Sequence, residues 1–233
     1  MKKLVLVLAL CAFTFASCGD DDENNGTISS FDGTITGTLK KMNWNGDFYT
    51  LSDVTDEVDE IHAMIYNEEI SVSEHFCSAT VTNGKFSIKL PTPNAEHLDA
   101  IGNLKDLKVS DKTVKTASVS FFRCSKNEAH LGNPYLRSAN ADEVISVEFV
   151  YVDSHLTVTG TTTDNSGFAT EYNANFKKGW NTLIYKGVSD TKGTVTTESI
   201  SANLLWVVSI IYDWDYEVGS STETKRGFKS FGK

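Results

Sequence analysis

The sequence is short of basic residues, and this shortage excludes two classes of partner. It has 21 lysines and arginines against 31 aspartates and glutamates, which gives a formal net charge of −10 at pH 7. Nucleic-acid-binding proteins need basic patches, and peripheral contact with anionic lipid needs clustered lysines and arginines. We therefore expect neither a nucleic-acid partner nor a basic contact with a membrane surface.

The sequence also lacks an apolar run long enough to cross a bilayer as a helix, which takes about 20 residues. The longest run, residues 4–15, has about 12 residues, the length of a signal-peptide core. The next, Leu204–Tyr212, is shorter still. We expect it to be a central strand buried on both faces, because such strands are apolar without alternation.

Several catalytic and cofactor-binding motifs are absent as well. There is no metalloprotease helix motif, no phosphate-binding loop, no dinucleotide fingerprint and no Gly-x-Ser-x-Gly elbow. The sequence therefore gives no positive case for an enzyme, and we expect a non-enzymatic protein with no cofactor and no metal.

The N-terminus has the three parts of an export signal. A positive start, Met1-Lys2-Lys3, precedes the apolar run, and the small pair Ala16-Ser17 precedes Cys18. This order resembles the lipobox of bacterial lipoproteins, with Phe15 in place of the usual leucine. The resemblance implies that residues 1–17 are a signal peptide and that Cys18 carries the lipid (palmitate among its acyl groups). The alternative is an ordinary secretory signal followed by a chance cysteine.

An acidic run follows the cysteine. Residues 20–23 are four consecutive acids, so residues 18–30 cannot form a core and are expected to be a flexible tether. The run resembles the export signal of lipoproteins that some Gram-negative bacteria display on the cell surface. That resemblance implies an outer-membrane protein facing the cell exterior. A plain acidic linker on a periplasm-facing lipoprotein is the alternative. Removal of Lys2 and Lys3 with the signal moves the formal charge from −10 to −12.

Most of the mature chain alternates apolar and polar residues in short runs rich in Thr, Val, Ile, Tyr and Phe, which predicts β-strands. The predicted strands are 34–39, 61–66, 85–90, 114–122, 144–152, 156–161, 170–176, 182–185, 194–199 and 204–212. Asn83-Gly84 between two such runs is a strong hairpin signal, because both residues tolerate positive φ. We predict an all-β fold, a β-sandwich or a pair of them.

One segment has a helical pattern. Apolar residues recur every third position in Asn94–Leu107, behind a cap candidate at Thr92 or Asn94. We predict a short helical connector, 94–112, between a β-sandwich half at 31–93 and a second antiparallel β half at 113–218. Residues 219–233 read as a polar tail.

The first half resembles the transthyretin-like sandwiches of bacterial surface proteins. The residues that carry the resemblance are Gly33-Thr34-Ile35-Thr36-Gly37 and the segment from Asn83 to Pro91. The resemblance implies a transthyretin-like N-terminal half.

The two remaining cysteines, Cys77 and Cys124, form one candidate disulfide pair, because an exported protein meets an oxidising compartment. Two buried thiols are the alternative. His75-Phe76-Cys77 places an imidazole and a thiol on one face of an extended strand, with Cys124 and His130 as further zinc ligands. This spacing matches no common zinc site, so we expect no metal there.

Four aromatic residues are candidates for ligand binding: Trp44, Tyr49, Trp180 and Trp214. Trp44 and Tyr49 flank a loop-like run that also holds Phe48, and aromatic rings beside Asn and Asp suit sugar faces. The alternative is a strand end whose aromatic residues cover the core.

Near the C-terminus, Asp213, Asp215 and Glu217 alternate with Tyr212, Trp214 and Tyr216. On a strand this makes one acidic and one aromatic face. Such acids suit a calcium site or a carboxylate pair for glycoside hydrolysis, although alternation is also the ordinary pattern of a half-buried strand.

The lipobox, the acidic tether and the β body together resemble the accessory lipoproteins of Sus-type nutrient uptake systems. That resemblance implies a glycan or peptide ligand, or docking onto a TonB-dependent transporter and its lid lipoprotein. Two alternatives remain: a structural, fimbria-like surface subunit whose edge strands pair with partners, and a hydrolase that uses carboxylates such as Asp213 or Asp215.

Overall fold

The computed structural model describes residues 31–44, 49–67, 72–140, 143–200 and 204–210. Within these ranges the protein is all-β, and its one helical element is the 3-10 turn η1 (Ala95–His97). No helix of the described ranges has the length and apolarity of a membrane span. The strands are β1 (Thr34–Trp44), β2 (Tyr49–Asp53), β3 (Glu60–Asn67), β4 (Val72–Thr80), β5 (Lys85–Lys89), β6 (Asp99–Ala100), β7 (Leu107–Val109), β8 (Lys115–Lys126), β9 (Ala129–Gly132), β10 (Tyr135–Ser138), β11 (Ile145–Val152), β12 (Leu156–Thr163), β13 (Ala169–Phe176), β14 (Gly179–Ser189), β15 (Lys192–Thr197) and β16 (Leu204–Val208).

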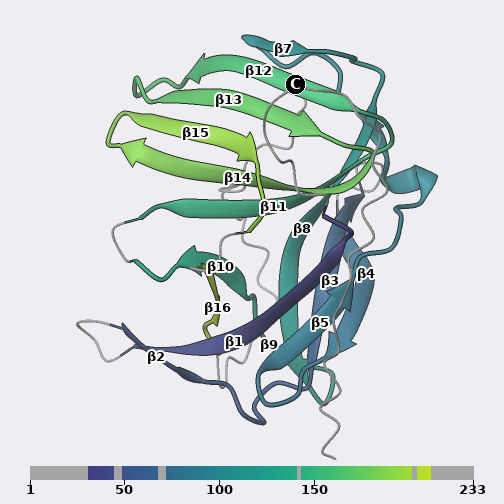
Figure 1. Cartoon of the computed structure of the whole chain (residues 1–233). Helices are drawn as coiled ribbons and strands as arrows, with labels where there is room; N and C mark the ends of the chain where they lie inside the picture. The colour runs from purple at the N-terminus through teal and green to yellow at the C-terminus, as the bar shows by residue number, and fades with distance from the viewer. Residues whose placement is uncertain (1–30, 45–48, 68–71, 141–142, 201–203, 211–233) are drawn as a thin grey trace, which may run out of the picture.

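The strands form two mixed sheets in a sandwich-like arrangement (Figure 1). The five-stranded sheet has the order β10-β16-β1-β2, with β5 paired to the first part of β1. The eleven-stranded sheet has the order β4-β3-β8-β11-β14-β15-β13-β12-β7, with β6 and β9 paired to β8. Both sheets take strands from both of the predicted halves of the chain.

A first core lies between the two sheets. Ile35, Leu39 and Trp206 of the five-stranded sheet pack in one buried cluster with Ile61 and Phe122 of the eleven-stranded sheet. Phe122 and Trp206 meet edge to face, with ring centroids 5.0 Å apart. This face-to-face burial is what makes the two sheets a sandwich, because each sheet hides its apolar face on the other.

A second core lies on the β11–β14–β15–β13–β12 part of the larger sheet. It contains Val152, Leu156, Phe176 and Val195, and the chain between η1 and β8 contributes Ile101. Alternation in β12 and β15 therefore has its expected cause, one buried and one more exposed face, whereas β11 and β14 contain consecutive buried residues.

The strand predicted at 204–212 is found over Leu204–Val208, and Ser209 and Ile210 lie beyond it. β16 lies between β10 and β1. The consecutive residues Trp206, Val207 and Val208 are all buried, so the strand is buried on both faces.

The helix predicted for Asn94–Leu107 is wrong beyond η1. Gly102 and Asp106 have positive φ values of 65° and 64°, which an α-helix does not permit. The regular spacing of apolar residues has another cause here: Leu98 packs against the first core, whereas Ile101 belongs to the second. This connector is extended and joins two cores.

The turn predicted at Asn83-Gly84 is confirmed, with φ values of 50° and 72°. Thr82 and Lys85 exchange both backbone hydrogen bonds across it. The flanking strands then separate, because β4 pairs with β3 and β5 pairs with β1. The turn therefore connects the two sheets. The hairpin does not extend beyond the turn, because β4 and β5 belong to different sheets.

Candidate functional site

The β1–β2 hairpin presents three cross-strand pairs on one face. Lys40 lies opposite Asp53, Met42 opposite Leu51, and Trp44 opposite Tyr49. Side chains directly opposite one another in an antiparallel ladder share a face, and every second residue joins them. We call the last two of these pairs the aromatic end of the hairpin.

The aromatic end exposes large apolar side chains, although Tyr49 itself is half-buried. The side chain of Trp44 is 68% exposed, and that of Leu51 is 37% exposed. The guanidinium carbon of Arg137, on β10, lies 4.7 Å from the centroid of the Tyr49 ring, which is within the range of a cation–π contact. The exposed indole of Trp44 therefore lies beside the Tyr49 ring, which contacts Arg137, and the indole has surface that a ligand could cover.

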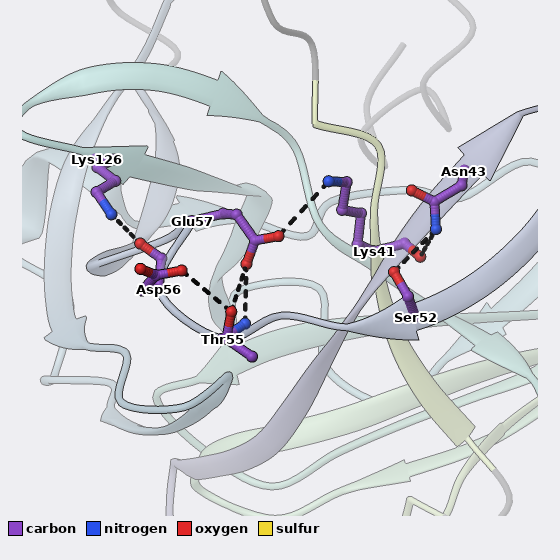
Figure 2. Close-up of polar contacts among 7 residues, drawn as sticks. All are labelled: Lys41, Asn43, Ser52, Thr55, Asp56, Glu57 and Lys126. Carbon is purple, nitrogen blue, oxygen red and sulfur yellow. Dashed lines mark hydrogen bonds and ion pairs between the residues drawn. The ribbon is translucent and has the colours of Figure 1, made fainter.

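The opposite face of the hairpin is polar and tied down (Figure 2). Asn43 donates to Ser52 Oγ over 2.9 Å, across the ladder between β1 and β2. The ammonium of Lys41 pairs with Glu57 at 3.6 Å. These contacts fix the hairpin from behind, so its outward face is set by rigid neighbours.

Glu57 is the centre of that network. Its carboxylate accepts hydrogen bonds from the backbone N–H of Thr55 (2.9 Å) and from the Thr55 hydroxyl (3.2 Å). The backbone N–H of Thr55 is the main cause that lowers the pKa of Glu57, and Lys41 adds to it. The side chain of Lys126 reaches the Asp56 carbonyl and ties the same turn to β8 (Figure 2).

The aromatic end has the chemistry of a sugar-binding surface. Flat rings stack on the C–H faces of a sugar, and a guanidinium donates hydrogen bonds to its hydroxyl groups.

A second feature of the same sheet is an open groove beside β1, which we call the β1 groove. It has a volume of about 600 Å³, within the range of ligand sites. Residues 34–38 of β1 line one side, and Leu204, Leu205, Thr182 and Ile200 line others.

One predicted ligand-binding residue, Trp180, lies away from the aromatic end. Trp180 is only 7% exposed and packs against Phe76 and Tyr151, so it is a core residue, and the prediction of a binding role for it is wrong. Trp214 lies outside the described residues, as do Phe48, Cys18 and the acids Asp213, Asp215 and Glu217.

The disulfide prediction is also wrong, because Cys77 and Cys124 are free. Cys77 is on β4 and Cys124 on β8, and β3 lies between these strands. Two strand spacings make about 10 Å, more than a disulfide can bridge. Burial raises the pKa of Cys77 to about 11 and that of Cys124 to about 12.

The shared face predicted for His75 and Cys77 does not form either. The register of β4 against β3 shifts between the pairs that contain His75 and Cys77, which leaves Phe76 as an extra residue. His75 is exposed, whereas Phe76 and Cys77 pack against the first core. In the described part of the chain no cluster of His, Cys, Asp and Glu is arranged to hold a metal ion.

One histidine–serine pair resembles part of a catalytic site but lacks access. His62 Nε2 lies 2.8 Å from Ser125 Oγ. Ser125 is 1% exposed, so a substrate cannot reach its hydroxyl. Burial is also the main cause that lowers the pKa of His62. The pair is a buried hydrogen bond between β3 and β8.

Sequence reasoning missed Arg137, Leu51 and the β1 groove. Alternation in Tyr49-Thr50-Leu51-Ser52-Asp53 was a local signal for β2. Arg137 is on β10 and Tyr49 on β2, at opposite ends of the strand order, so their contact depends on the tertiary fold and has no local signal.

No family model matches the chain, and no curated protein or solved structure matches it.

Proposed function

We propose that the protein is a surface-anchored, non-enzymatic lipoprotein that binds a glycan at the aromatic end of the β1–β2 hairpin and serves an outer-membrane uptake complex. The observation that carries this proposal is the 68% exposed indole of Trp44 opposite Tyr49, whose ring Arg137 covers. An exposed Trp beside a Tyr and an Arg supports the proposal, because these three residue types are enriched in binding hot spots.

The anchoring part of the proposal is supported by Cys18 and the acids that follow it. Lipid at Cys18 holds the domain at the membrane, and the tether lets it sample a volume beside a transporter. Such tethering raises the effective ligand concentration at the importer. We also propose that residues 31–93 form a transthyretin-like part of the sandwich.

The binding step is tested by titrating the purified protein with glycans selected on a glycan array. Trp44→Ala is expected to weaken binding by about 30-fold or more, because aromatic hot spots contribute about 2 kcal/mol or more. Phe121→Ala is the matched control, since Phe121 is an exposed aromatic residue of the other sheet, 39% exposed. Equal affinities of the Trp44→Ala and Phe121→Ala variants would remove this site from the proposal.

The uptake role needs a second measurement. Purification from outer membranes in mild detergent is expected to recover a TonB-dependent transporter and its lid lipoprotein with the protein. Recovery of the protein alone would contradict a stable complex and leave glycan binding to be judged by the titration.

A further inference from the structure

The first part of β1 has a strand partner on one side only. In Figure 1, β5 and β16 lie on opposite sides of β1. β5 pairs with residues 34–38, whereas the pairing with β16 begins at Leu39, which lies opposite Trp206. Among the described strands, none pairs with residues 34–38 on the β16 side. This open edge is five residues long, about 17 Å.

The β1 groove runs along this open edge. Its lining includes every residue from Thr34 to Thr38 together with Leu204 and Leu205, which pair with β10 and not with β1. The first residues of β16 therefore diverge from β1, and the groove occupies the space that a neighbouring strand would fill. An unpaired edge beside a groove is a template for an added strand.

The lining of the groove is almost uncharged, so it favours a strand whose inward face is also uncharged. Ile35 and Trp206 are buried residues at its wall, and the threonines at 34, 36 and 38 bring hydroxyl groups. Lys40 is the one charged residue among the described lining residues, and its ammonium is paired with Asp53. A strand with one aromatic face and one acidic face fits, because its rings enter the groove while its acids stay in water near Lys40.

The chain itself contains such a segment. Tyr212, Trp214 and Tyr216 alternate with Asp213, Asp215 and Glu217 just beyond the described strand β16. From this combination we propose that the segment 212–218 of a second copy of the chain adds to the open edge of β1 in the β1 groove.

Reach favours a second copy over the same chain. β16 is parallel to β1 and leaves past Lys41, away from residues 34–38. Val208 lies opposite Lys41 at the end of this pairing, so β16 has already passed Thr38 and runs away from it. A segment of the same chain would have to reverse to reach residues 34–38, which takes at least two residues, whereas the segment of a second copy needs no reversal.

The contact is head to tail: one copy's C-terminal segment lies in the next copy's groove. Such a heterologous contact builds rings or open chains. It is separate from the proposed glycan site, because the open edge and Trp44 are at opposite ends of β1. Failure of either proposal therefore leaves the other intact.

The test uses two variants of the full chain, purified from membranes in detergent. Thr36→Arg places a long charged side chain in the groove, since Thr36 is exposed and lines it. Trp214→Ala removes a ring from the donor segment. Thr161→Arg, at an exposed threonine of β12, is the control. A cooperative thermal unfolding transition in each of the four proteins establishes that the variants fold.

Light scattering then measures the protein mass across concentration. The wild type and Thr161→Arg are expected to grow in mass with concentration, whereas Thr36→Arg and Trp214→Ala each stay monomeric. An equimolar mixture of the two monomeric variants is expected to double in mass and stop at two copies, because only one intact groove meets one intact donor segment.

Three outcomes would overturn the proposal. One is a wild type that stays monomeric. Another is a mixture of the two variants that does not double in mass. The third is a monomer whose β1 edge is protected from hydrogen exchange and loses that protection in Trp214→Ala, which would mean that the chain fills its own groove.

Discussion

The indole Nε1 of Trp180 donates a hydrogen bond of 2.8 Å to the carbonyl oxygen of Pro91. The two residues are 89 positions apart in the sequence. Trp180 is the second residue of β14 in the larger sheet, and Pro91 follows β5 of the smaller one. The bond therefore ties the segment after β5, in the smaller sheet, to β14 in the larger sheet. It lies beside the rings of Phe76 and Tyr151, which contact Trp180.

Trp180→Phe is expected to lower the free energy of unfolding by about 1 kcal/mol, because the Pro91 carbonyl loses its donor. Trp180→Ala is expected to cost about 3–5 kcal/mol, since it also leaves a cavity beside the first core. Denaturant unfolding measures both values. Trp44→Ala is the control and is expected to change stability little; a loss as large as that of Trp180→Ala would show that Trp44 is a core residue too.

Glu148→Gln is expected to stabilise the protein at neutral pH. Burial raises the pKa of Glu148 on β11, so the folded state holds its proton more tightly than the unfolded state does. Ionisation of Glu148 therefore lowers the free energy of unfolding. This loss is complete at pH values above the raised pKa, and it is absent below the ordinary pKa of a glutamate, about 4.3. Melting temperatures of the two proteins should therefore converge in acid.

Glu128→Gln, at an exposed glutamate, is the control for that experiment. It should not raise the melting temperature at neutral pH. A Glu148→Gln protein that is less stable than the wild type at neutral pH would mean that the carboxylate has a stabilising partner.

The two cysteines are expected to resist alkylation in the folded protein at pH 8. Their pKa values of about 11 and about 12 leave almost no thiolate, which is the reactive form. Mass spectrometry should show no added alkyl group at Cys77 or Cys124 without denaturant and two after unfolding, with no reduction step. If the unfolded protein were labelled only after reduction, Cys77 and Cys124 would form a disulfide and this prediction would be wrong.

Replacement of residues 20–23 by alanine is expected to retain lipid at Cys18 and to remove the protein from the cell surface. The reason is that the acids, and not the lipid, resemble the outward export signal. Protease treatment of intact cells measures exposure, and labelling with a palmitate analogue measures lipidation. Cys18→Ala is the companion variant, and it should abolish labelling. If the alanine variant stayed exposed on the cell surface, residues 20–23 would be a plain acidic linker and not an export signal.

Local pattern predicted most strands because alternation is a property of neighbouring residues. Glu60–Asn67 and Leu156–Thr163 are both found this way. The connector failed for the opposite reason. Leu98 and Ile101 have helical spacing, but each contacts a different core, and that partition is set by residues far along the chain.

The candidate site was predictable in part. Trp44 and Tyr49 could be named because aromatic residues beside Asn and Asp have a known use, and both lie at the exposed hairpin end. The role of Arg137 and the open edge of β1 could not be predicted, because each depends on how strands distant in sequence are placed in the fold. The bulge at Phe76 likewise reverses a face assignment through one unpaired residue.

The parallel pairing of β1 with β16 joins residues near 40 to residues near 207. The smaller sheet therefore cannot close until almost the whole chain is available. Contacts so distant in sequence are slow to form, because the intervening loop must first be ordered. Under the proposed export, β1 emerges long before its last neighbour, and its edge is then open to other chains until β16 arrives. Slow closure then makes this strand the point at which folding competes with the proposed export and assembly.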